Sequence, residues 1–161
     1  MLEPLANPFI TVSKRYLSAL TKMVAQLTID RYHYVLILID SHDENLSQKA
    51  LAEILHIDKS YMATILDYLE EKGFVTREKN PIDRREQVIK LTLLAQNSIP
   101  IIRQAIKKLN ERAFQNIGHS NKQIFHEVLG SIQQNLIELP SNQEEKTVSI
   151  LKNYHWCPIK I

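Results

Sequence analysis

Residues 46–92 read LSQKALAEILHIDKSYMATILDYLEEKGFVTREKNPIDRREQVIKLT, and this stretch decides the fold. Ser47 can cap a first helix that starts at about Gln48, because its hydroxyl can accept a hydrogen bond from a free amide of the first turn. Asp58 is a cap of the same kind and predicts a second helix from Lys59 to about Lys72. Gly73 then stands where a helix end favours a residue that tolerates positive φ. The stretch therefore opens with two short helices joined by a tight turn.

The second of these helices has one apolar face and one polar face. The apolar positions recur at helical spacing and are Met62, Ile65, Leu66 and Leu69. The opposite face carries Lys59, Ser60, Tyr61, Ala63, Thr64 and Asp67. Two short helices of this kind are typical of a helix-turn-helix, whose second helix enters a major groove with its N-terminal end. The alternative interpretation of the polar face is an ordinary solvent-exposed surface.

A charged hairpin follows the two helices. Two β-rich runs, 74–79 and 87–91, flank the turn formers Asn80, Pro81 and Asp83. The tip of this hairpin carries Arg84 and Arg85. Residues 72–90 hold a net charge of +3, whereas the whole chain has a formal charge of +2. The positive charge is concentrated on the hairpin, as expected of a segment that meets a polyanion.

These motifs resemble those of the multiple-antibiotic-resistance regulators (MarR family) of bacteria, which are winged helix-turn-helix transcription factors. The resemblance lies above all in "LEEKGFVTR", which closes the second helix, and in "DRR" at the hairpin tip. In that family an Asp-x-Arg at the wing tip inserts the arginine into a minor groove while the aspartate holds it. The resemblance assigns these roles to Arg85 and Asp83. The chain departs from the family at Thr92–Ala95, because the family has Thr-x-x-Gly there.

The predicted DNA contacts fall into three groups. Residues at helix starts or on the strand flank are expected to meet phosphate: Ser47, Gln48, Lys59 and Lys79. Residues on the outer face of the second helix are expected near base edges, where hydroxyls can serve phosphate or base equally: Ser60, Tyr61, Ala63 and Thr64. The wing contributes Arg77, Asp83, Arg84 and Arg85, with Arg77 also a candidate partner for the Asp83 carboxylate.

Longer helices flank this 46–91 lobe. Asn7 and Pro8 predict a helix to about Leu27 with two apolar sides, and Thr28 or Asp30 predicts a second helix to Asp40. Thr92 predicts a helix to about Ile117, with a bend or a displaced start at Pro100. Ser120 and Gln123 predict a capping box for a last helix to about Glu138. We expect 8–40 and 92–138 to be dimerisation helices of a single domain, 1–161, whose tail, 139–161, includes a short docked helix.

Composition excludes several other classes of protein. The chain has 161 residues, no leader-like start and no apolar run long enough to span a membrane, which favours a cytoplasmic location. The single Cys157 cannot form an internal disulfide. The six histidines form no pair at helical ligand spacing, so we expect no metal and no cofactor. The sequence contains no nucleophile–base pattern and no phosphate-binding loop, so we expect that the protein is not an enzyme.

The sequence therefore predicts a mainly α fold with a small β wing: a winged helix-turn-helix flanked by long dimerisation helices. The predicted function is a sequence-specific transcriptional regulator, a repressor, that binds double-stranded DNA as a homodimer on a pseudo-palindromic operator. The resemblance implies control by a small aromatic or anionic effector, for which Tyr16, Tyr32 and Tyr34 could line a pocket; ordinary core tyrosines are the alternative. The competing function is a winged-helix module that binds another protein and no nucleic acid.

Overall fold

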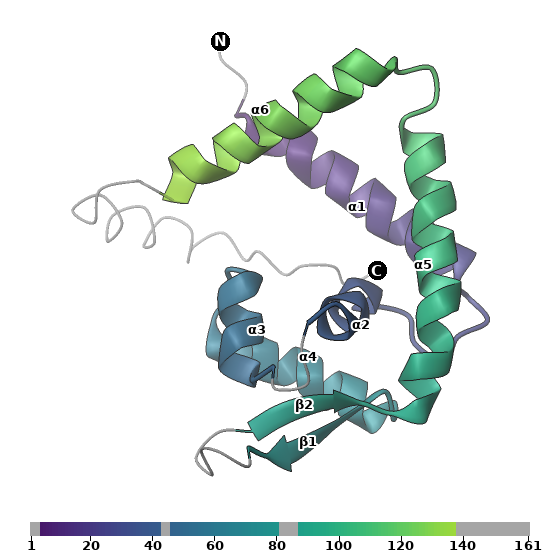
Figure 1. The fold of residues 1–161 in the computed structure, drawn as a ribbon, viewed down its shortest axis with the longest axis vertical. Helices are drawn as coiled ribbons and strands as arrows, with labels where there is room; N and C mark the ends of the chain where they lie inside the picture. The colour runs from purple at the N-terminus through teal and green to yellow at the C-terminus, as the bar shows by residue number, and fades with distance from the viewer. Residues whose placement is uncertain (1–3, 43–45, 81–86, 138–161) are drawn as a thin grey trace. The chain divides into compact units, whose positions relative to one another are not determined.

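A computed structural model describes residues 4–42, 46–80 and 87–137. These residues form helices and one two-stranded sheet (Figure 1). In chain order the elements are α1 (Ala6–Met23), α2 (His33–Asp40), α3 (Gln48–Ile54), α4 (Lys59–Glu71), β1 (Val75–Lys79), β2 (Gln87–Leu91), α5 (Leu93–Ala113) and α6 (His119–Ile137). The mainly α fold with a small β wing is confirmed. The chain divides into two compact units, Met1–Leu109 and Asn110–Ile161, and the expectation of a single domain over 1–161 stays a prediction.

The caps expected for α3 and α4 are present. The Ser47 hydroxyl accepts a hydrogen bond from the Ala50 amide at 3.2 Å, and the Asp58 carboxylate accepts one from the Tyr61 amide at 2.8 Å. Gly73 follows α4 with a φ of +77°, the left-handed conformation that a glycine adopts without steric cost. The two helices therefore start and end where local sequence signals place them.

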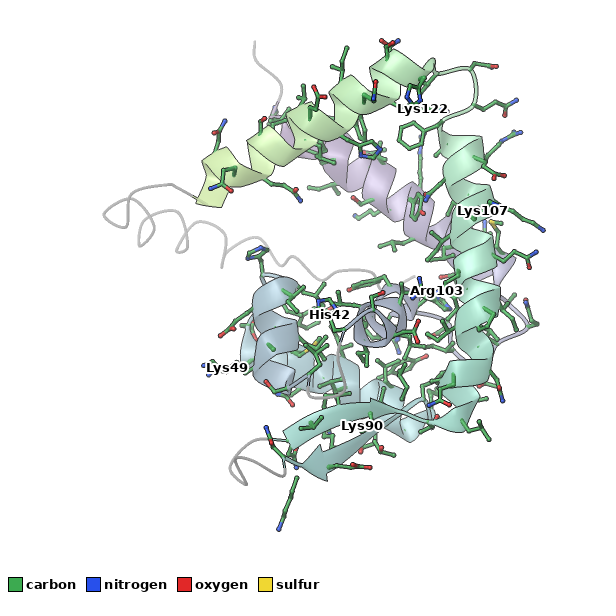
Figure 2. All side chains as sticks on the ribbon, viewed as in Figure 1. His42, Lys49, Lys90, Arg103, Lys107 and Lys122 are labelled. Carbon is green, nitrogen blue, oxygen red and sulfur yellow. The ribbon has the colours of Figure 1, made fainter. Side chains whose placement is uncertain are left out.

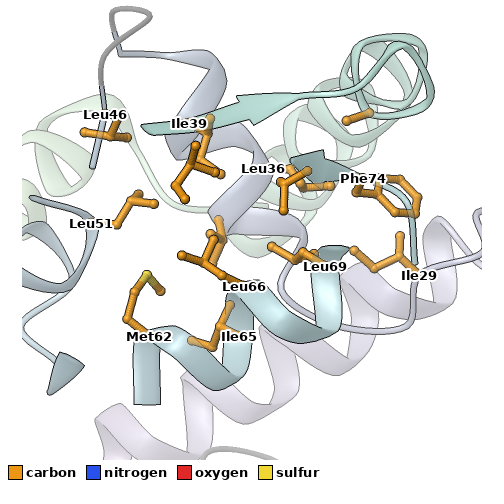
Figure 3. Packing of buried hydrophobic residues seen from close by; sticks show 14 of the residues in the cluster. Ile29, Leu36, Ile39, Leu46, Leu51, Met62, Ile65, Leu66, Leu69 and Phe74 are labelled. Atoms are coloured by element: carbon orange, nitrogen blue, oxygen red, sulfur yellow. The ribbon is translucent and has the colours of Figure 1, made fainter. Parts of the chain in front are cut away.

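The main core lies between α2, α3, α4 and the sheet (Figure 3). Its most buried side chains are fully shielded from water and include Leu36, Leu51, Met62, Ile65, Leu66, Leu69 and Phe74. Burying one such side chain stabilises a fold by roughly 1.5–3 kcal/mol. The four apolar positions expected on α4 all belong to this set, so the core fixes which face of α4 points outward.

The sheet is a hairpin whose register pairs Val75 with Leu91 and Lys79 with Gln87. The segment before α3 extends it, because the Ile89 amide donates to the Leu46 carbonyl at 3.0 Å. Ser47 forms a bridge with Val88 on the same side. The base of the wing is thus hydrogen-bonded to the start of the helix-turn-helix.

The ends of α1 and α2 differ from the prediction. α1 begins at Ala6 with Leu5 at its N-cap, and it ends at Met23 instead of Leu27. Asn7 therefore lies in the first turn, where the missing amide of Pro8 costs nothing because those amides have no helical partner. α2 begins at His33, after Tyr32 in a left-handed conformation, and not at Thr28 or Asp30. The intervening chain turns so that Ile29 enters the main core.

α5 packs against α1 and α2. Ala105 and Leu109 form a second cluster with Leu20 and Val24 of α1. Arg103 donates from Nη2 to Asp40 Oδ2 at 2.6 Å, which joins α5 to the end of α2 (Figure 2). α5 begins at Leu93, so the predicted displaced start at Pro100 was wrong, and the alternative, a bend there, stays a prediction.

α5 starts at its predicted cap but ends earlier than predicted. Its Thr92 cap is present, with the hydroxyl accepting from the Ala95 amide at 3.3 Å. The helix runs through Pro100 and stops at Ala113, four residues before the predicted end. Buried residues on both sides of the proline, Ile99 and Ile102, hold the helix against the core there.

The second unit contains α6 and the turn before it. α6 starts at His119, so Ser120 lies inside the first turn and the predicted capping box was wrong. The helical hydrogen bonds begin with the Gly118 carbonyl, which accepts a hydrogen bond from the Lys122 amide. The Phe114 ring packs edge-on against Phe125 with centroids 5.8 Å apart. Large apolar side chains on α6 stay exposed in the single chain: Ile124, Phe125, Val128 and Leu136. The predicted tail, 139–161, lies outside the described residues.

Candidate nucleic-acid interface

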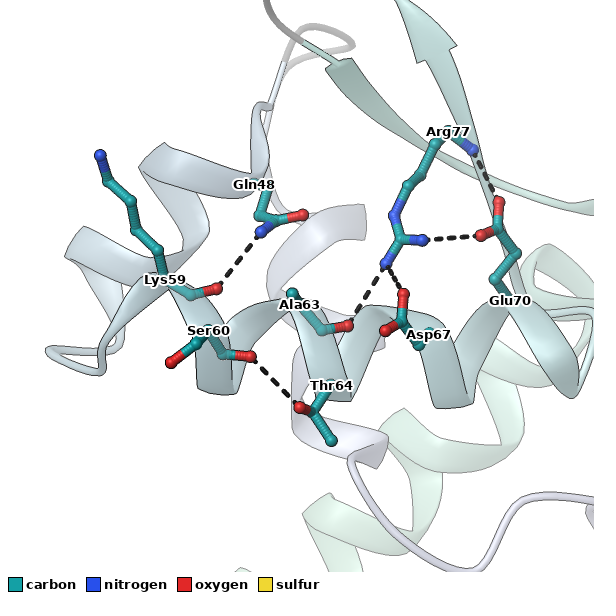
Figure 4. Close-up of polar contacts among 8 residues, drawn as sticks. All are labelled: Gln48, Lys59, Ser60, Ala63, Thr64, Asp67, Glu70 and Arg77. Carbon is teal, nitrogen blue, oxygen red and sulfur yellow. Dashed lines mark hydrogen bonds and ion pairs between the residues drawn. The ribbon is translucent and has the colours of Figure 1, made fainter.

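The two helices of the helix-turn-helix are tied together at their N-terminal ends. Gln48, the first residue of α3, donates from its side chain to the backbone carbonyl of Lys59, the first residue of α4, at 3.3 Å (Figure 4). The chain between the helices passes through His56 with a φ of 50°. This left-handed residue makes the turn tight, and the Gln48 bond then holds the first turns of both helices close to each other.

The outer face of α4 is small, polar and accessible at its N-terminal half. Ser60 and Thr64 are exposed, whereas Tyr61 and Ala63 are half-buried. The Thr64 hydroxyl donates to the Ser60 carbonyl at 3.2 Å, so its oxygen keeps acceptor capacity toward the outside. Short side chains on an exposed helix face let the backbone approach base edges in a major groove.

Asp58 caps this helix and shapes the charge at its start. The Ser60 hydroxyl donates to Asp58 Oδ1 at 2.5 Å, and the Tyr61 amide donates to the same oxygen. These two donors, the hydroxyl first, hold the pKa of the Asp58 carboxyl below its ordinary value. The two bonds therefore favour the charged carboxylate, which orients the Ser60 side chain.

Arg77, named as an expected DNA contact and as a candidate partner for Asp83, instead packs against α4. Its guanidinium bonds Asp67 Oδ1 at 2.6 Å and Glu70 Oε2 at 2.8 Å, both on α4 (Figure 4). Only 16% of its side chain is exposed. Because its end nitrogens are engaged within the protein, the structure does not present the Arg77 guanidinium to a ligand.

The other expected contacts are placed unevenly. Ser47 is buried and its hydroxyl is used as a helix cap, so the structure does not present it to a ligand. Lys59 and Lys79 are exposed, at the start of α4 and the end of β1. Gln48 is half-buried and bonded to Lys59. Asp83, Arg84 and Arg85 lie outside the described residues.

The three tyrosines named for an effector pocket do not pack in one place. Tyr16 packs against the second cluster, between α1 and α5, whereas Tyr32 and Tyr34 pack against the main core. Burial raises the pKa of the Tyr16 hydroxyl and of the Tyr34 hydroxyl. All three are half-buried. A shared pocket for them stays a prediction.

Sequence reasoning missed a polar cluster around Tyr68, on α4. Its hydroxyl donates to the Asp30 carboxylate, and the Arg31 guanidinium lies over its ring, 4.4 Å from the centroid. The Tyr32 ring packs edge-on against it with centroids 5.6 Å apart. The signal was weak, because Tyr68 stands among the apolar positions of α4 and its partners are 36 to 38 residues away. The cluster ties the chain before α2 to the candidate reading helix.

Among the described residues, no group of three or more His, Cys, Asp or Glu side chains could hold a metal ion. No helix among them is both long enough and apolar enough to cross a membrane.

Comparison with known proteins agrees with this geometry. Residues 27–87 match the model of the MarR family. A protein of Thauera aromatica named for transcriptional regulation of the hcr operon is 25% identical over 112 residues, which cover 70% of this chain and 68% of that protein. The crystal structure of the transcriptional regulator SlyA superposes with a TM-score of 0.75 at 19% identity, covering 83% of this chain and 94% of SlyA.

A third relative has been solved with two different ligands. CouR bound to a 23-mer DNA duplex superposes with a TM-score of 0.70 at 22% identity, covering 81% of this chain and 92% of CouR. CouR from Rhodococcus jostii RHA1 bound to p-coumaroyl-CoA superposes with a TM-score of 0.68 at 24% identity, covering 81% of this chain and 95% of that one. At these identities the superpositions establish the fold that surrounds the candidate interface.

Proposed function

We propose that the chain is a transcriptional regulator of the MarR family, whose model matches residues 27–87, and that it binds double-stranded DNA sequence-specifically, as a homodimeric repressor in the cytoplasm. The observation that carries the proposal is the outer face of α4. Its core-facing side is fixed by four buried residues, while Ser60 and Thr64 stay accessible beside the capped N-terminus. This face would enter a major groove, where Ser60 and Thr64 meet base edges and Lys59 meets phosphate.

The wing supplies the second part of the proposed contact. Residues 72–90 carry the concentrated positive charge, and Lys79 is exposed at the end of β1. We propose that Arg84 and Arg85 reach the flanking minor groove, where a narrow groove focuses negative potential, with Asp83 orienting Arg85. The sheet carries the wing on the same lobe as α4, which supports a joint contact with one half-site.

The exposed apolar side chains support the homodimer. Val12 on α1 is 65% exposed, and Val128 on α6 is 52% exposed. Both stand on helix faces that carry further apolar residues. Such faces lose contact with water when a second copy of the chain covers them. Two-fold symmetry would then require a pseudo-palindromic operator whose half-sites lie about one helical turn, roughly 10 base pairs, apart.

The proposed effector is a small aromatic or anionic molecule. CouR, which shares the fold, has been seen with a DNA duplex and with p-coumaroyl-CoA, an aromatic and anionic ligand. An effector that binds one arrangement of the dimer better than another would shift the population toward that arrangement and so change the affinity for the operator. Tyr16, Tyr32 and Tyr34 are the residues proposed to contact it.

Selection of bound duplexes from a random pool, followed by affinity measurements over a range of salt concentrations, tests the proposal. Each phosphate contact contributes about 0.9 to the slope of log affinity against log salt, so Lys59→Ala should shallow the slope by about two units in a dimer. Lys22→Ala is the matched control, because Lys22 is an exposed lysine at the end of α1, outside residues 46–91, which we call the reading lobe. Failure to enrich any duplex would reject DNA binding and favour a protein-binding module.

A further inference from the structure

Arg77 bonds three residues of the helix that is proposed to read DNA. Its Nη2 donates to Asp67 Oδ1 at 2.6 Å and to the Ala63 carbonyl at 3.3 Å, and its Nη1 donates to Glu70 Oε2 at 2.8 Å. Its backbone amide donates to the other oxygen of Glu70 at 3.2 Å. One strand residue is therefore held to α4 by both its side chain and its backbone (Figure 4).

The partners of Arg77 are spaced along one side of α4, and we call Arg77 with these three residues the clamp. Ala63, Asp67 and Glu70 follow one another at i, i+4 and i+7, so they form one stripe along the flank of α4 beside Ser60 and Thr64. A guanidinium is planar and presents its donors in a fixed fork, so bonds to several partners at once fix its orientation as well as its position. β1 is thereby locked at one place along the helix axis.

We propose that Arg77 is a positioning residue, which sets the wing relative to α4, and that it touches no DNA itself. The proposal rests on the proposed DNA-binding function. When α4 and the wing enter neighbouring grooves of one duplex, the spacing between them must match the spacing of the grooves. A wing that is free to tilt would meet this requirement only part of the time, and its affinity would fall by that fraction.

The test compares Arg77→Ala, Arg77→Lys and Lys79→Ala on a duplex selected by the unaltered protein, over a range of salt concentrations. Arg77→Ala should weaken binding roughly 10- to 100-fold at every salt concentration while the slope against log salt is unchanged. Arg77→Lys keeps the charge but loses the fork, so it should lose nearly as much. Lys79→Ala, two residues along the same strand and exposed, should instead shallow the slope.

Three results would overturn the proposal. A shallower slope for Arg77→Ala, by about one unit per subunit, would make Arg77 a phosphate contact. Full affinity of Arg77→Lys would mean that charge alone matters. Unchanged affinity of Arg77→Ala would mean that the clamp has no role in binding.

Two further measurements keep the proposal testable if Arg77→Ala fails to fold or if the protein binds no DNA. If Arg77→Ala fails to fold, Asp67→Ala combined with Glu70→Ala removes the acceptor oxygens instead and should also weaken binding. If the unaltered protein binds no duplex, the proposed function fails, and the clamp is judged by unfolding. Arg77→Ala and Asp67→Ala should then show losses of stability that are not additive, whereas additive losses would reject the clamp.

Discussion

Thr92 joins the reading lobe to α5, and replacing it with valine should destabilise the fold by about 1–2 kcal/mol. Its hydroxyl donates to the Gly73 carbonyl at 2.7 Å and accepts from the Ala95 amide at 3.3 Å. Valine has the same shape, so only the hydroxyl is lost. Loss of an N-cap costs roughly 0.5–2 kcal/mol, and a hydrogen bond adds about 1 kcal/mol. Gly73 is exposed, so water replaces part of that bond and the total stays near the lower end.

Thermal unfolding followed by circular dichroism, at one fixed protein concentration, measures this effect. For a chain of this size the expected loss lowers the melting temperature by roughly 2–8 °C. Thr92→Ser is the matched control, because serine keeps the hydroxyl, and it should remain within about 0.5 kcal/mol of the unaltered protein. Equal melting temperatures for Thr92→Val and the unaltered protein would refute the role of the hydroxyl in joining the Gly73 carbonyl to the start of α5.

Three other predictions concern assembly and titration. Val12→Glu or Val128→Glu should shift the protein toward monomer in sedimentation, and a dimer unchanged by both would reject these faces as the interface. Burial lowers the pKa of His33 below its ordinary 6.5, so the unfolded chain takes up its proton first on acidification. The contribution of His33 to the free energy of unfolding should be complete above pH 6.5 and should fall as the pH drops through the lowered pKa. Urea unfolding of His33→Gln should show a weaker dependence of the free energy of unfolding on pH. The Tyr68 hydroxyl holds the pKa of Asp30 below its ordinary value, so Tyr68→Phe should raise it in an NMR titration, and an unchanged titration would remove the bond.

Local signals sufficed to predict the reading lobe. The caps at Ser47 and Asp58, the apolar stripe of α4 and the glycine at position 73 each act within a few residues of the structure that they specify. Such signals survive folding when the tertiary structure agrees with them. The hairpin strands follow for the same reason, because turn formers separate two β-rich runs.

Tertiary packing determines the features that local sequence signals did not predict: the start of α2 and the partners of Asp30 and Arg77. The start of α2 depends on Tyr32 adopting a left-handed conformation, and no cap residue signals it. Asp30, an expected cap, is instead the acceptor of a hydroxyl 38 residues away. Arg77 was expected at DNA because it stands in a basic hairpin. Its true partners became identifiable only when the register of β1 along α4 was known.

The most direct test of the account is a photo-crosslinker placed at position 64, in the middle of the outer face of α4, on a protein bound to its selected duplex. The account predicts crosslinks from position 64 to bases through the major groove, in both half-sites. Tight binding without crosslinks from position 64, together with full affinity of Ser60→Ala and Thr64→Ala, would contradict it.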